Sequence, residues 1–343
     1  MLMVILGAGA SYDSAPSFPV HFKNTRARPP LADQLFDDER PIFRSIITKY
    51  AQCHPIVPNL RTRHGKSLED VLQTFQAEAD SYPARVSQLL AVRYYIRDVI
   101  ESCSNPWLSE IDGITNHVSL VDQIQHWQKP DEAVLFVTFN YDELLEHALR
   151  PFQFHTNKLD GYITTHDRFK LFKLHGSINW IHYLKNSGDT SYRGNDISYG
   201  PDEIIGLGPE IAFDDAFNIT PNTKADASHG RLFVPAIAIP LTCKTTFECP
   251  ASHIQWLESM LPKVTKILII GWRASEEHFM KMLKQQLKEL QALTVVSASD
   301  AEDTMLRLQE ELRPITAETK WDWSSDGFSD FITKQKGKAF FCL

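Results

Sequence analysis

Short apolar runs recur along the chain, and each one stops at glycine or at polar residues. A strand buried on both faces of a parallel sheet has this pattern, so we interpret the runs as strands. The predicted strands are Met3–Leu6, Ala133–Thr138, Phe169–Leu174, Lys266–Ile270 and Thr294–Ser297, with a further strand-like run at Leu232–Ile239. A helical pattern follows four of them. This alternation predicts an α/β fold with a doubly wound, mostly parallel sheet.

Between residues 31 and 130 the apolar positions recur at helical spacing instead. Ser67 and Asp70 predict a capping box at the start of one helix. The other predicted helices of this region begin at Leu31 or cover Pro41–Tyr50, Val86–Ile100 and Leu120–Trp127. We interpret residues 31–130 as a helical module inserted into a single domain that spans residues 1–343.

Two later regions have weaker patterns. Residues 181–230 hold many Gly, Asp, Asn and Ser residues, which predicts loops and short hairpins. The stretch Trp321–Leu343 is aromatic and partly polar. We expect it to close the core or to lie at an interface between copies of the chain, and we expect a homo-oligomer.

Composition narrows the class of protein. A net charge of −8 argues against a general nucleic-acid binder. No apolar stretch approaches the roughly 20 residues that span a bilayer, and the chain begins directly with a predicted strand, so we expect a cytoplasmic protein without membrane binding. The five cysteines are scattered and form no Cys-x-x-Cys pair, which argues against a structural zinc ribbon.

The first predicted strand runs into Gly7-Ala8-Gly9-Ala10-Ser11. Gly7 allows a tight turn, and Gly9 removes a side chain that would hold a phosphate away from main-chain N–H groups. A helix after the turn would point its partial positive charge at an anion. The residues therefore predict a bound nucleotide diphosphate, held from Gly7 through Ala8 and Gly9 to Ser11. The alternative is an ordinary glycine-rich turn without a ligand.

Two further strand ends carry polar side chains. Asn140 could hold a water molecule against a reacting carbon, and Asp142 could accept a hydrogen bond from an amide or a ribose hydroxyl. The alternative for both is helix capping. His175 could take a proton from a hydroxyl or from water, and Gly176 beside it would leave room for a ligand. A structural histidine is the alternative here.

The two later strand ends could hold the adenosine half of a dinucleotide. Gly271 permits a close backbone approach, Arg273 could face a phosphate, and Ser297 and Asp300 could bind ribose hydroxyls. The alternative is helix capping by Asp300, and by Ser275 at the preceding strand end.

In this order, the four motifs resemble those of the sirtuin superfamily, and in particular its bacterial sirtuin-like NAD hydrolases. The motifs are Gly7-Ala8-Gly9-Ala10-Ser11, Thr138-Phe139-Asn140-Tyr141-Asp142, His175-Gly176-Ser177 and the stretch from Gly271 onward. The resemblance implies a Rossmann-like sirtuin core with NAD as the substrate. Sirtuin deacylases carry a four-cysteine zinc module, for which this chain lacks the cysteines. They also carry an arginine in a segment that corresponds here to Tyr12–Pro19, which has none.

Phe139 and Trp272-Arg273 also depart from the deacylase pattern, which has Gln and Thr-Ser there. These departures favour the branch that cleaves NAD with water during phage infection, with Asn140 and His175 as the catalytic pair and without zinc. The resemblance implies a partner such as a HerA-type ATPase or an Argonaute-like protein. Two alternatives stay open: an NAD-dependent deacylase or ADP-ribosyltransferase, and a non-catalytic sensor of NAD or ADP-ribose.

Overall fold

The computed structural model describes residues 1–343 with the exception of 19–26, 186–200, 221–226, 229–230, 241–246 and 314–317. The chain divides into two compact units. The first consists of Met1–Pro29, Ser104–His175 and Lys244–Leu343, and the second of Pro30–Cys103 and Gly176–Cys243. The assignment of residues 31–130 as an insertion in a single domain stays a prediction.

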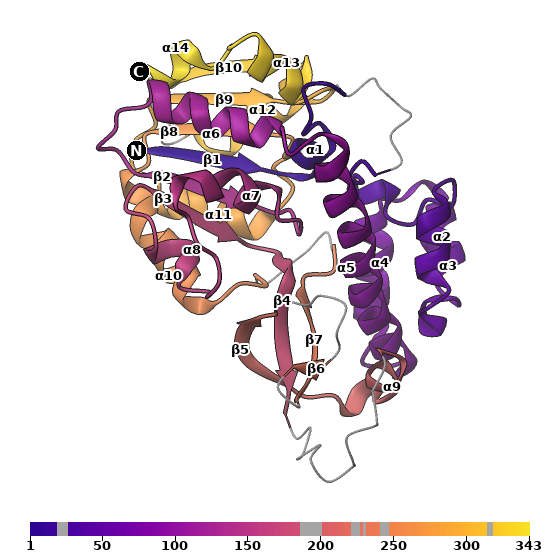
Figure 1. Ribbon diagram of the computed structural model, residues 1–343. Coiled ribbons are helices and arrows are strands. Elements are labelled where there is room, and N and C mark those ends of the chain that lie inside the picture. Colours follow the sequence, from indigo (N-terminus) through magenta and orange to yellow (C-terminus); the bar gives the residue numbers. More distant parts are fainter. Residues whose placement is uncertain (19–26, 186–200, 221–226, 229–230, 241–246, 314–317) are drawn as a thin grey trace. The chain divides into compact units, whose positions relative to one another are not determined.

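The first unit contains a sheet of six parallel strands (Figure 1). They are β1 (Leu2–Leu6), β2 (Val134–Thr138), β3 (Phe169–Lys173), β8 (Lys266–Ile270), β9 (Ala292–Val296) and β10 (Lys320–Ser324). Their order is β10-β9-β8-β1-β2-β3, so the chain starts in the middle of the sheet, extends it to one side and then returns to extend the other. This order is typical of dinucleotide-binding folds. The predicted doubly wound α/β fold is confirmed.

All six strands end in register. Leu6 pairs with Thr138 and with Ile270, and the register continues from Thr138 to Lys173 and from Ile270 through Val296 to Ser324. Every residue of β1, β2, β3, β8 and β9 is buried. Burial of each Val, Leu or Ile side chain contributes about 1.5–3 kcal/mol, which explains why continuous apolar runs form these strands. The residues that follow the strands therefore emerge along one edge of the sheet.

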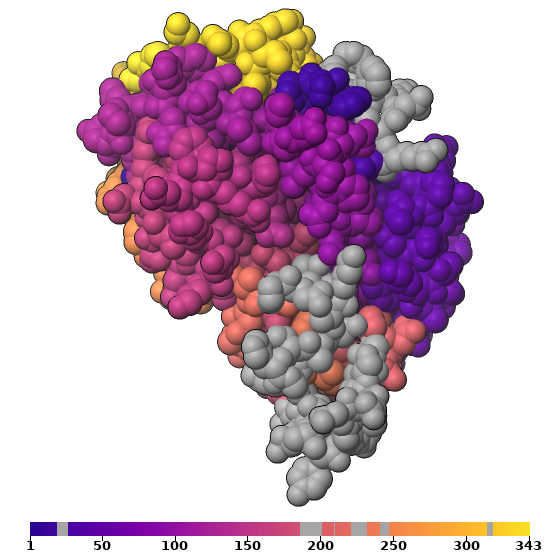
Figure 2. All heavy atoms as spheres, viewed as in Figure 1, coloured from indigo at the N-terminus to yellow at the C-terminus, as the bar shows by residue number. Residues whose placement is uncertain are grey.

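Nine helices of the described residues lie in the first unit: α1 (Ala8–Tyr12), α6 (Asn116–Trp127), α7 (Leu144–Leu149), α8 (Gly161–Thr164), α10 (Ala251–Met260), α11 (Glu277–Gln286), α12 (Ala301–Glu311), α13 (Gly327–Thr333) and α14 (Lys338–Phe341). Helix α6 contacts α7, α13 and α14. Figure 2 shows the C-terminal residues, in yellow, along one side of this unit. The stretch Trp321–Leu343 thus supplies an edge strand and two helices that cover the sheet.

Buried hydrogen bonds also connect α13 to the residues that follow α1. The Asp13 carboxylate accepts hydrogen bonds from the hydroxyl of Ser329 at 2.6 Å and from its main-chain N–H at 3.0 Å. Asn116 donates to the main-chain oxygen of Asp13 at 2.7 Å. All three side chains are buried, so the segment that follows β1 is held from both sides.

The second unit combines helices with an antiparallel sheet. Its helices are α2 (Pro41–Ile47), α3 (Val57–Thr62), α4 (Leu68–Glu78) and α9 (Pro201–Gly206), and the boundary between the units falls inside α5 (Ala84–Glu110). The strands β4 (Gly176–Leu184), β5 (Phe213–Ile219), β6 (Ala227–Ser228) and β7 (Arg231–Ile237) lie in the order β5-β4-β7-β6. The predicted capping box of α4 is confirmed, because Asp70 N donates to Ser67 Oγ at 3.0 Å and Ser67 N to Asp70 Oδ2 at 3.3 Å.

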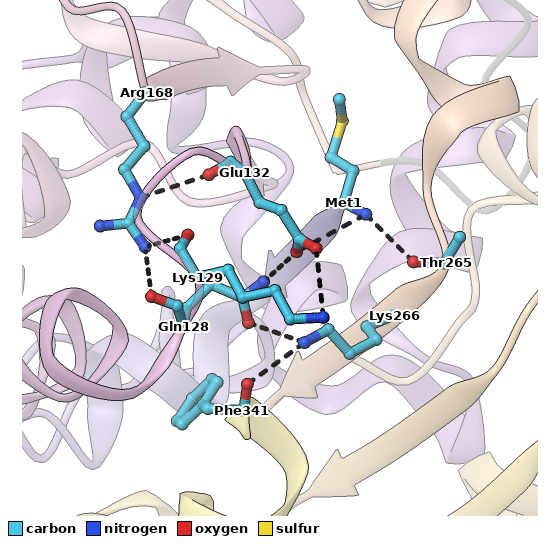
Figure 3. A network of polar contacts seen from close by, with 8 residues as sticks. All are labelled: Met1, Gln128, Lys129, Glu132, Arg168, Thr265, Lys266 and Phe341. Atoms are coloured by element: carbon cyan, nitrogen blue, oxygen red, sulfur yellow. Dashed lines mark hydrogen bonds and ion pairs between the residues drawn. The ribbon is translucent and has the colours of Figure 1, made fainter. Parts of the chain in front are cut away.

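A polar network lies at the amino ends of β1 and β8, opposite the edge where the strands end (Figure 3). Arg168, just before β3, donates to the main-chain oxygens of Gln128, Lys129 and Glu132 at 3.0, 3.1 and 3.2 Å. Lys266 is buried and donates to Gln128 Oε1 at 2.8 Å. The network satisfies main-chain carbonyls beyond the end of α6, where the helix itself no longer supplies donors.

The structure predicts a pH-dependent stability through His117 of α6. This side chain is fully buried, and its ring meets Phe328 edge-on at 5.4 Å. Burial lowers the pKa of His117 to about 4, although the nearby Asp142 carboxylate opposes the shift. Between pH 6.5 and 4 the unfolded chain therefore binds a proton here that the folded chain does not bind. We expect the free energy of unfolding to fall across this range, and His117→Phe to flatten the fall in urea titrations. His126→Phe, at an exposed position of the same helix, is the control, and an equal fall in wild type and His117→Phe would contradict the expectation.

No helix in the described ranges has the length and apolar character needed to cross a membrane. The same ranges hold no group of three or more His, Cys, Asp or Glu side chains suited to a metal ion. Cys53, Cys103, Cys249 and Cys342 are free thiols, and Cys243 lies outside the described residues. The expected absence of zinc stays a prediction.

Candidate nucleotide-binding and catalytic site

The strand order places the candidate site. In open parallel sheets, ligands bind beyond the carboxyl ends of the strands, where the order of the strands reverses. Here that point lies between β1 and β8, which are neighbours in the sheet. The residues that follow β1, β2, β3, β8 and β9 are those singled out from the sequence.

The glycines after β1 and β8 allow two main-chain turns to pack directly against each other. Gly7 N donates to Ile270 O at 3.0 Å, and Gly9 N donates to Gly271 O at 3.1 Å. A Cβ on Gly7 would lie 2.5 Å from Gly271 O, and one on Gly9 would lie 2.8 Å from Gly271 Cα. The sequence interpretation missed this reason for the glycines.

This packing bears on the predicted diphosphate site. The amides of Gly7, Gly9 and Ala10 all donate to main-chain carbonyls, and α1 is a single turn of five residues. Any phosphate bound at Gly7–Ser11 must therefore use other donors or displace these bonds. The roles of Gly7, Ala8, Gly9 and Gly271 in binding a nucleotide stay predictions.

Gly271→Ala is expected to destabilise the fold by about 3 kcal/mol or more. Gly271 has a φ of +61°, and an added Cβ would lie 2.4 Å from Ala10 N. Both the left-handed backbone and the clash disfavour a side chain. Gly206→Ala is the control, because Gly206 has no atom within 4 Å of the added Cβ. Urea unfolding would measure both variants, and a stability of Gly271→Ala equal to that of Gly206→Ala would contradict the packing argument.

Asn140, Ser11 and Asp142 form one buried hydrogen-bonded cluster. Asn140 Nδ2 donates to Gly7 O and to Ser11 Oγ, both at 2.8 Å, and Ser11 Oγ donates to Asp142 Oδ2 at 2.6 Å. The donor and acceptor of each hydrogen bond follow from chemistry, because an ionised carboxylate can only accept hydrogen bonds. Ser11 must donate to Asp142 and so accepts from Asn140. The Asn140 amide is thereby fixed with Oδ1 as its remaining acceptor.

The alternative of helix capping applies in part. Leu144 N donates to Asp142 Oδ1 at 3.0 Å, so Asp142 does satisfy an amide at the start of α7. Its other carboxylate oxygen still binds Ser11. Asn140 does not cap α7, since its amide nitrogen donates toward the end of β1. Helix capping therefore accounts for one of the two carboxylate oxygens of Asp142, and it does not account for the contacts of the Asn140 side chain.

His175 follows β3 and packs against the two neighbours of Asn140. Its ring meets Phe139 edge-on at 4.9 Å and lies 6.4 Å from Tyr141 at an angle of 29°. Phe139 in turn stacks on Trp272, 5.3 Å away and nearly parallel. Phe139, Trp272 and His175 are each at most 6 % exposed. An apolar wall therefore runs from His175 to the turn after β8.

Gly7 makes this wall possible. A Cβ on Gly7 would lie 2.7 Å from Trp272 Cα, so a side chain there would push Trp272 away from Phe139. Gly176 has a packing role that the sequence did not indicate. It is left-handed, with φ of +80°, and an added Cβ would lie 1.9 Å from Ala236 O of β7. Contact within the antiparallel sheet thus requires this glycine, and the expected room for a ligand beside His175 stays a prediction.

Lys173 is a residue that the sequence interpretation missed. It ends β3 and is fully buried with Glu146 of α7. Lys173 Nζ donates to Glu146 Oε1 at 2.8 Å and to the main-chain oxygen of Asp142 at 2.5 Å. The signal in the sequence was a lysine at the end of an otherwise mostly apolar strand. Lys173 holds the peptide that carries the Asp142 carboxylate.

Arg273 and Ser297 belong to a second cluster, which is built on Asp300. Arg273 Nε donates to Asp300 Oδ2 at 2.5 Å, and Ser297 Oγ donates to Asp300 Oδ1 at 2.6 Å. Burial raises the pKa of Asp300, but the hydrogen bond from Ser297 and the charge of Arg273 outweigh it, so the pKa lies below its usual value. The two predicted nucleotide-binding side chains after β8 and β9 are thus brought together.

Comparison with known proteins finds a family-model match over one segment of the chain. Residues 134–200 match the family model described as the SIR2-like domain. The matched range includes β2, β3 and the site residues Asn140, Asp142 and His175. No curated protein sequence matches the chain at a significant level.

Solved structures with a similar course of the chain are sirtuins. Sir2Tm bound to a propionylated peptide is 12% identical, with a TM-score of 0.41 over 99% of this chain and 94% of that one. Sir2 with an inhibitor, 2′-O-acetyl-ADP-ribose and a deacetylated p53 peptide is 13% identical, with a TM-score of 0.39 over 99% and 94%. A Sir2 variant with a p53 peptide and NAD is 12% identical, with a TM-score of 0.39 over 99% and 93%. The SIR2-like match over residues 134–200 supports an NAD-dependent activity for this chain.

Proposed function

We propose that the protein hydrolyses NAD⁺ to nicotinamide and ADP-ribose. The observation that carries this proposal is the buried Asp142–Ser11–Asn140 cluster, which fixes an amide beside the point where the strand order reverses. The SIR2-like match over the same segment supports it.

The fold suggests how the dinucleotide lies. In this strand order the two nucleoside halves bind on either side of the reversal, with the diphosphate between them. We place the diphosphate near Gly7–Ser11 and the nicotinamide ribose over the ends of β2 and β3, near Asp142. The adenosine half then lies over the ends of β8 and β9, near Gly271, Arg273 and Ser297.

The reaction would use the groups around the nicotinamide ribose as follows. The bond from the ribose carbon to the nicotinamide nitrogen breaks, its electron pair neutralises the nicotinamide, and positive charge develops on the sugar. Asn140 Oδ1 accepts a hydrogen bond from the attacking water or from a ribose hydroxyl. His175 takes the proton that the water loses, directly or through that hydroxyl. The wall of Phe139 and Trp272 limits the access of bulk water.

Nicotinamide release by the purified full chain tests the proposal. We expect release from NAD⁺ alone, with no increase when an acetylated-lysine peptide is added. Release that requires the peptide would favour a deacylase or another transferase. Tight binding of ADP-ribose without release from NAD⁺ would favour a sensor.

We also propose that the activity serves anti-phage defence together with a partner, a HerA-type ATPase or an Argonaute-like protein, and that the chain forms a homo-oligomer. The resemblance of the four motifs supports this part. Light scattering and purification with the products of neighbouring genes would test it. A monomer that is fully active by itself would contradict it.

A further inference from the structure

Asp300 stands at a position where aspartate usually caps a helix, but it does not do so. It is the residue before α12, and no capping hydrogen bond to its side chain is present. Its carboxylate instead accepts from Ser297 at 2.6 Å, from Ser299 at 3.2 Å and from Arg273 at 2.5 Å. The carboxylate is therefore held toward the turn after β8 rather than toward its own helix.

The two charges of this cluster differ in how firmly they are held. The Asp300 side chain is 26 % exposed and is fixed by two hydroxyls of its own loop, whereas the Arg273 side chain is 72 % exposed. An ion pair with one such exposed partner contributes little to stability, so Arg273 can leave it at small cost. Asp300 is thus a preorganised acceptor, and Arg273 is a cation that it restrains.

Both residues lie on the side of the strand reversal away from Asn140 and His175. They follow β8 and β9, whereas Asn140 and His175 follow β2 and β3. A dinucleotide bound across the point where the strand order reverses, with its adenosine half over β8 and β9, would bring its adenosine ribose to this cluster. In dinucleotide sites an acidic side chain binds the 2′-hydroxyl of that ribose, and an arginine accommodates a 2′-phosphate.

We propose that Asp300 selects a dinucleotide whose adenosine ribose carries a free 2′-hydroxyl, and that it prevents Arg273 from binding a 2′-phosphate. The carboxylate accepts a hydrogen bond from the hydroxyl. A 2′-phosphate, with almost two negative charges, would be repelled by it. The inference rests on the proposed function in two respects, that the ligand is a dinucleotide or its ADP-ribose product and that its adenosine half lies over the ends of β8 and β9.

Calorimetric titration of the full chain with ADP-ribose and with ADP-ribose 2′-phosphate tests this inference without turnover. We expect the wild type to bind ADP-ribose at least about tenfold more tightly. In Asp300→Ala the ratio should shift toward the phosphorylated compound by about tenfold or more, because Arg273 is released. Adding Arg273→Ala should abolish this gain. Asp303→Ala, an exposed acid in the first turn of α12, is the matched control and should leave the ratio unchanged.

The outcomes separate two kinds of failure. If both compounds bind the wild type and Asp300→Ala leaves their ratio unchanged, the selectivity assigned to Asp300 is wrong and the nucleotide site stands. Equal affinity of the wild type for both compounds also overturns that assignment. If neither compound binds, the dinucleotide site of the proposed function is wrong as well.

Discussion

Asn140→Ala and His175→Ala are each expected to lower the rate of nicotinamide release from NAD⁺ by a factor on the order of 10²–10⁴. Asn140→Ala removes the acceptor Oδ1 and breaks the chain of hydrogen bonds through Ser11 to Asp142. His175→Ala removes the proposed proton acceptor and leaves a space beside Phe139. Chromatographic assay of nicotinamide, with calorimetric titration of ADP-ribose, would measure both effects.

Controls separate chemistry from folding in this experiment. Asn140→Asp keeps the shape of the side chain but removes the nitrogen that donates to Gly7 O and Ser11, so it should be as inactive as Asn140→Ala. Asn59→Ala, at an exposed position of α3, should keep full activity. Unchanged nicotinamide release by a folded Asn140→Ala or His175→Ala variant would refute the assigned roles.

Lys173→Met is expected to lower the free energy of unfolding by about 3–5 kcal/mol. Lys173 and Glu146 are buried together, and removal of the lysine leaves the Glu146 carboxylate without its partner charge. The Glu146 Oε2 atom has no hydrogen-bond partner among the described residues, and the long hydrogen bond from the Tyr162 hydroxyl to Oε1, at 3.4 Å, carries no charge that could replace the lysine. Urea denaturation would measure the loss. Lys170→Met, at the other lysine of β3, removes a hydrogen bond to the main-chain oxygen of His166 and leaves no buried carboxylate alone, so it should cost less.

A double variant separates the two bonds of Lys173. In Lys173→Met with Glu146→Leu, no buried charge is left alone, so we expect most of the stability to return. Asp142 O still lacks its donor, so activity should stay low, with the loss in kcat rather than in KM. Full recovery of both stability and activity would show that Lys173 does not position Asp142.

The sequence predicted the strands best where both faces are buried. β1, β2, β3, β8 and β9 begin and end within two residues of the predicted runs. The sixth strand, β10, was missed because it lies at the edge of the sheet, where Lys320, Asp322 and Trp323 are exposed and no apolar run forms. The run Leu232–Ile239 was recognised as strand-like, but its place in an antiparallel sheet depends on pairing with β4 that no local pattern encodes.

The candidate site, like the fold, could be predicted from the sequence only in part. Short motifs at strand ends identified Asn140, Asp142 and His175, because polar residues after buried strands stand out. The pairing of Arg273 with Asp300 could not be predicted, because it requires β8 and β9 to be neighbours in register. The same holds for the glycines, whose packing partner Gly271 lies more than 260 residues beyond Gly9 in the chain.

The position of β1 has a consequence for the order of folding during synthesis. Its residues are synthesised before those of both neighbouring strands, because one of its edges pairs with Val134–Thr138 and the other with Lys266–Ile270. Contacts so distant in sequence form slowly, and an apolar strand without neighbours is prone to aggregate. Nascent chains released before residue 266 should therefore depend on chaperones to remain unaggregated.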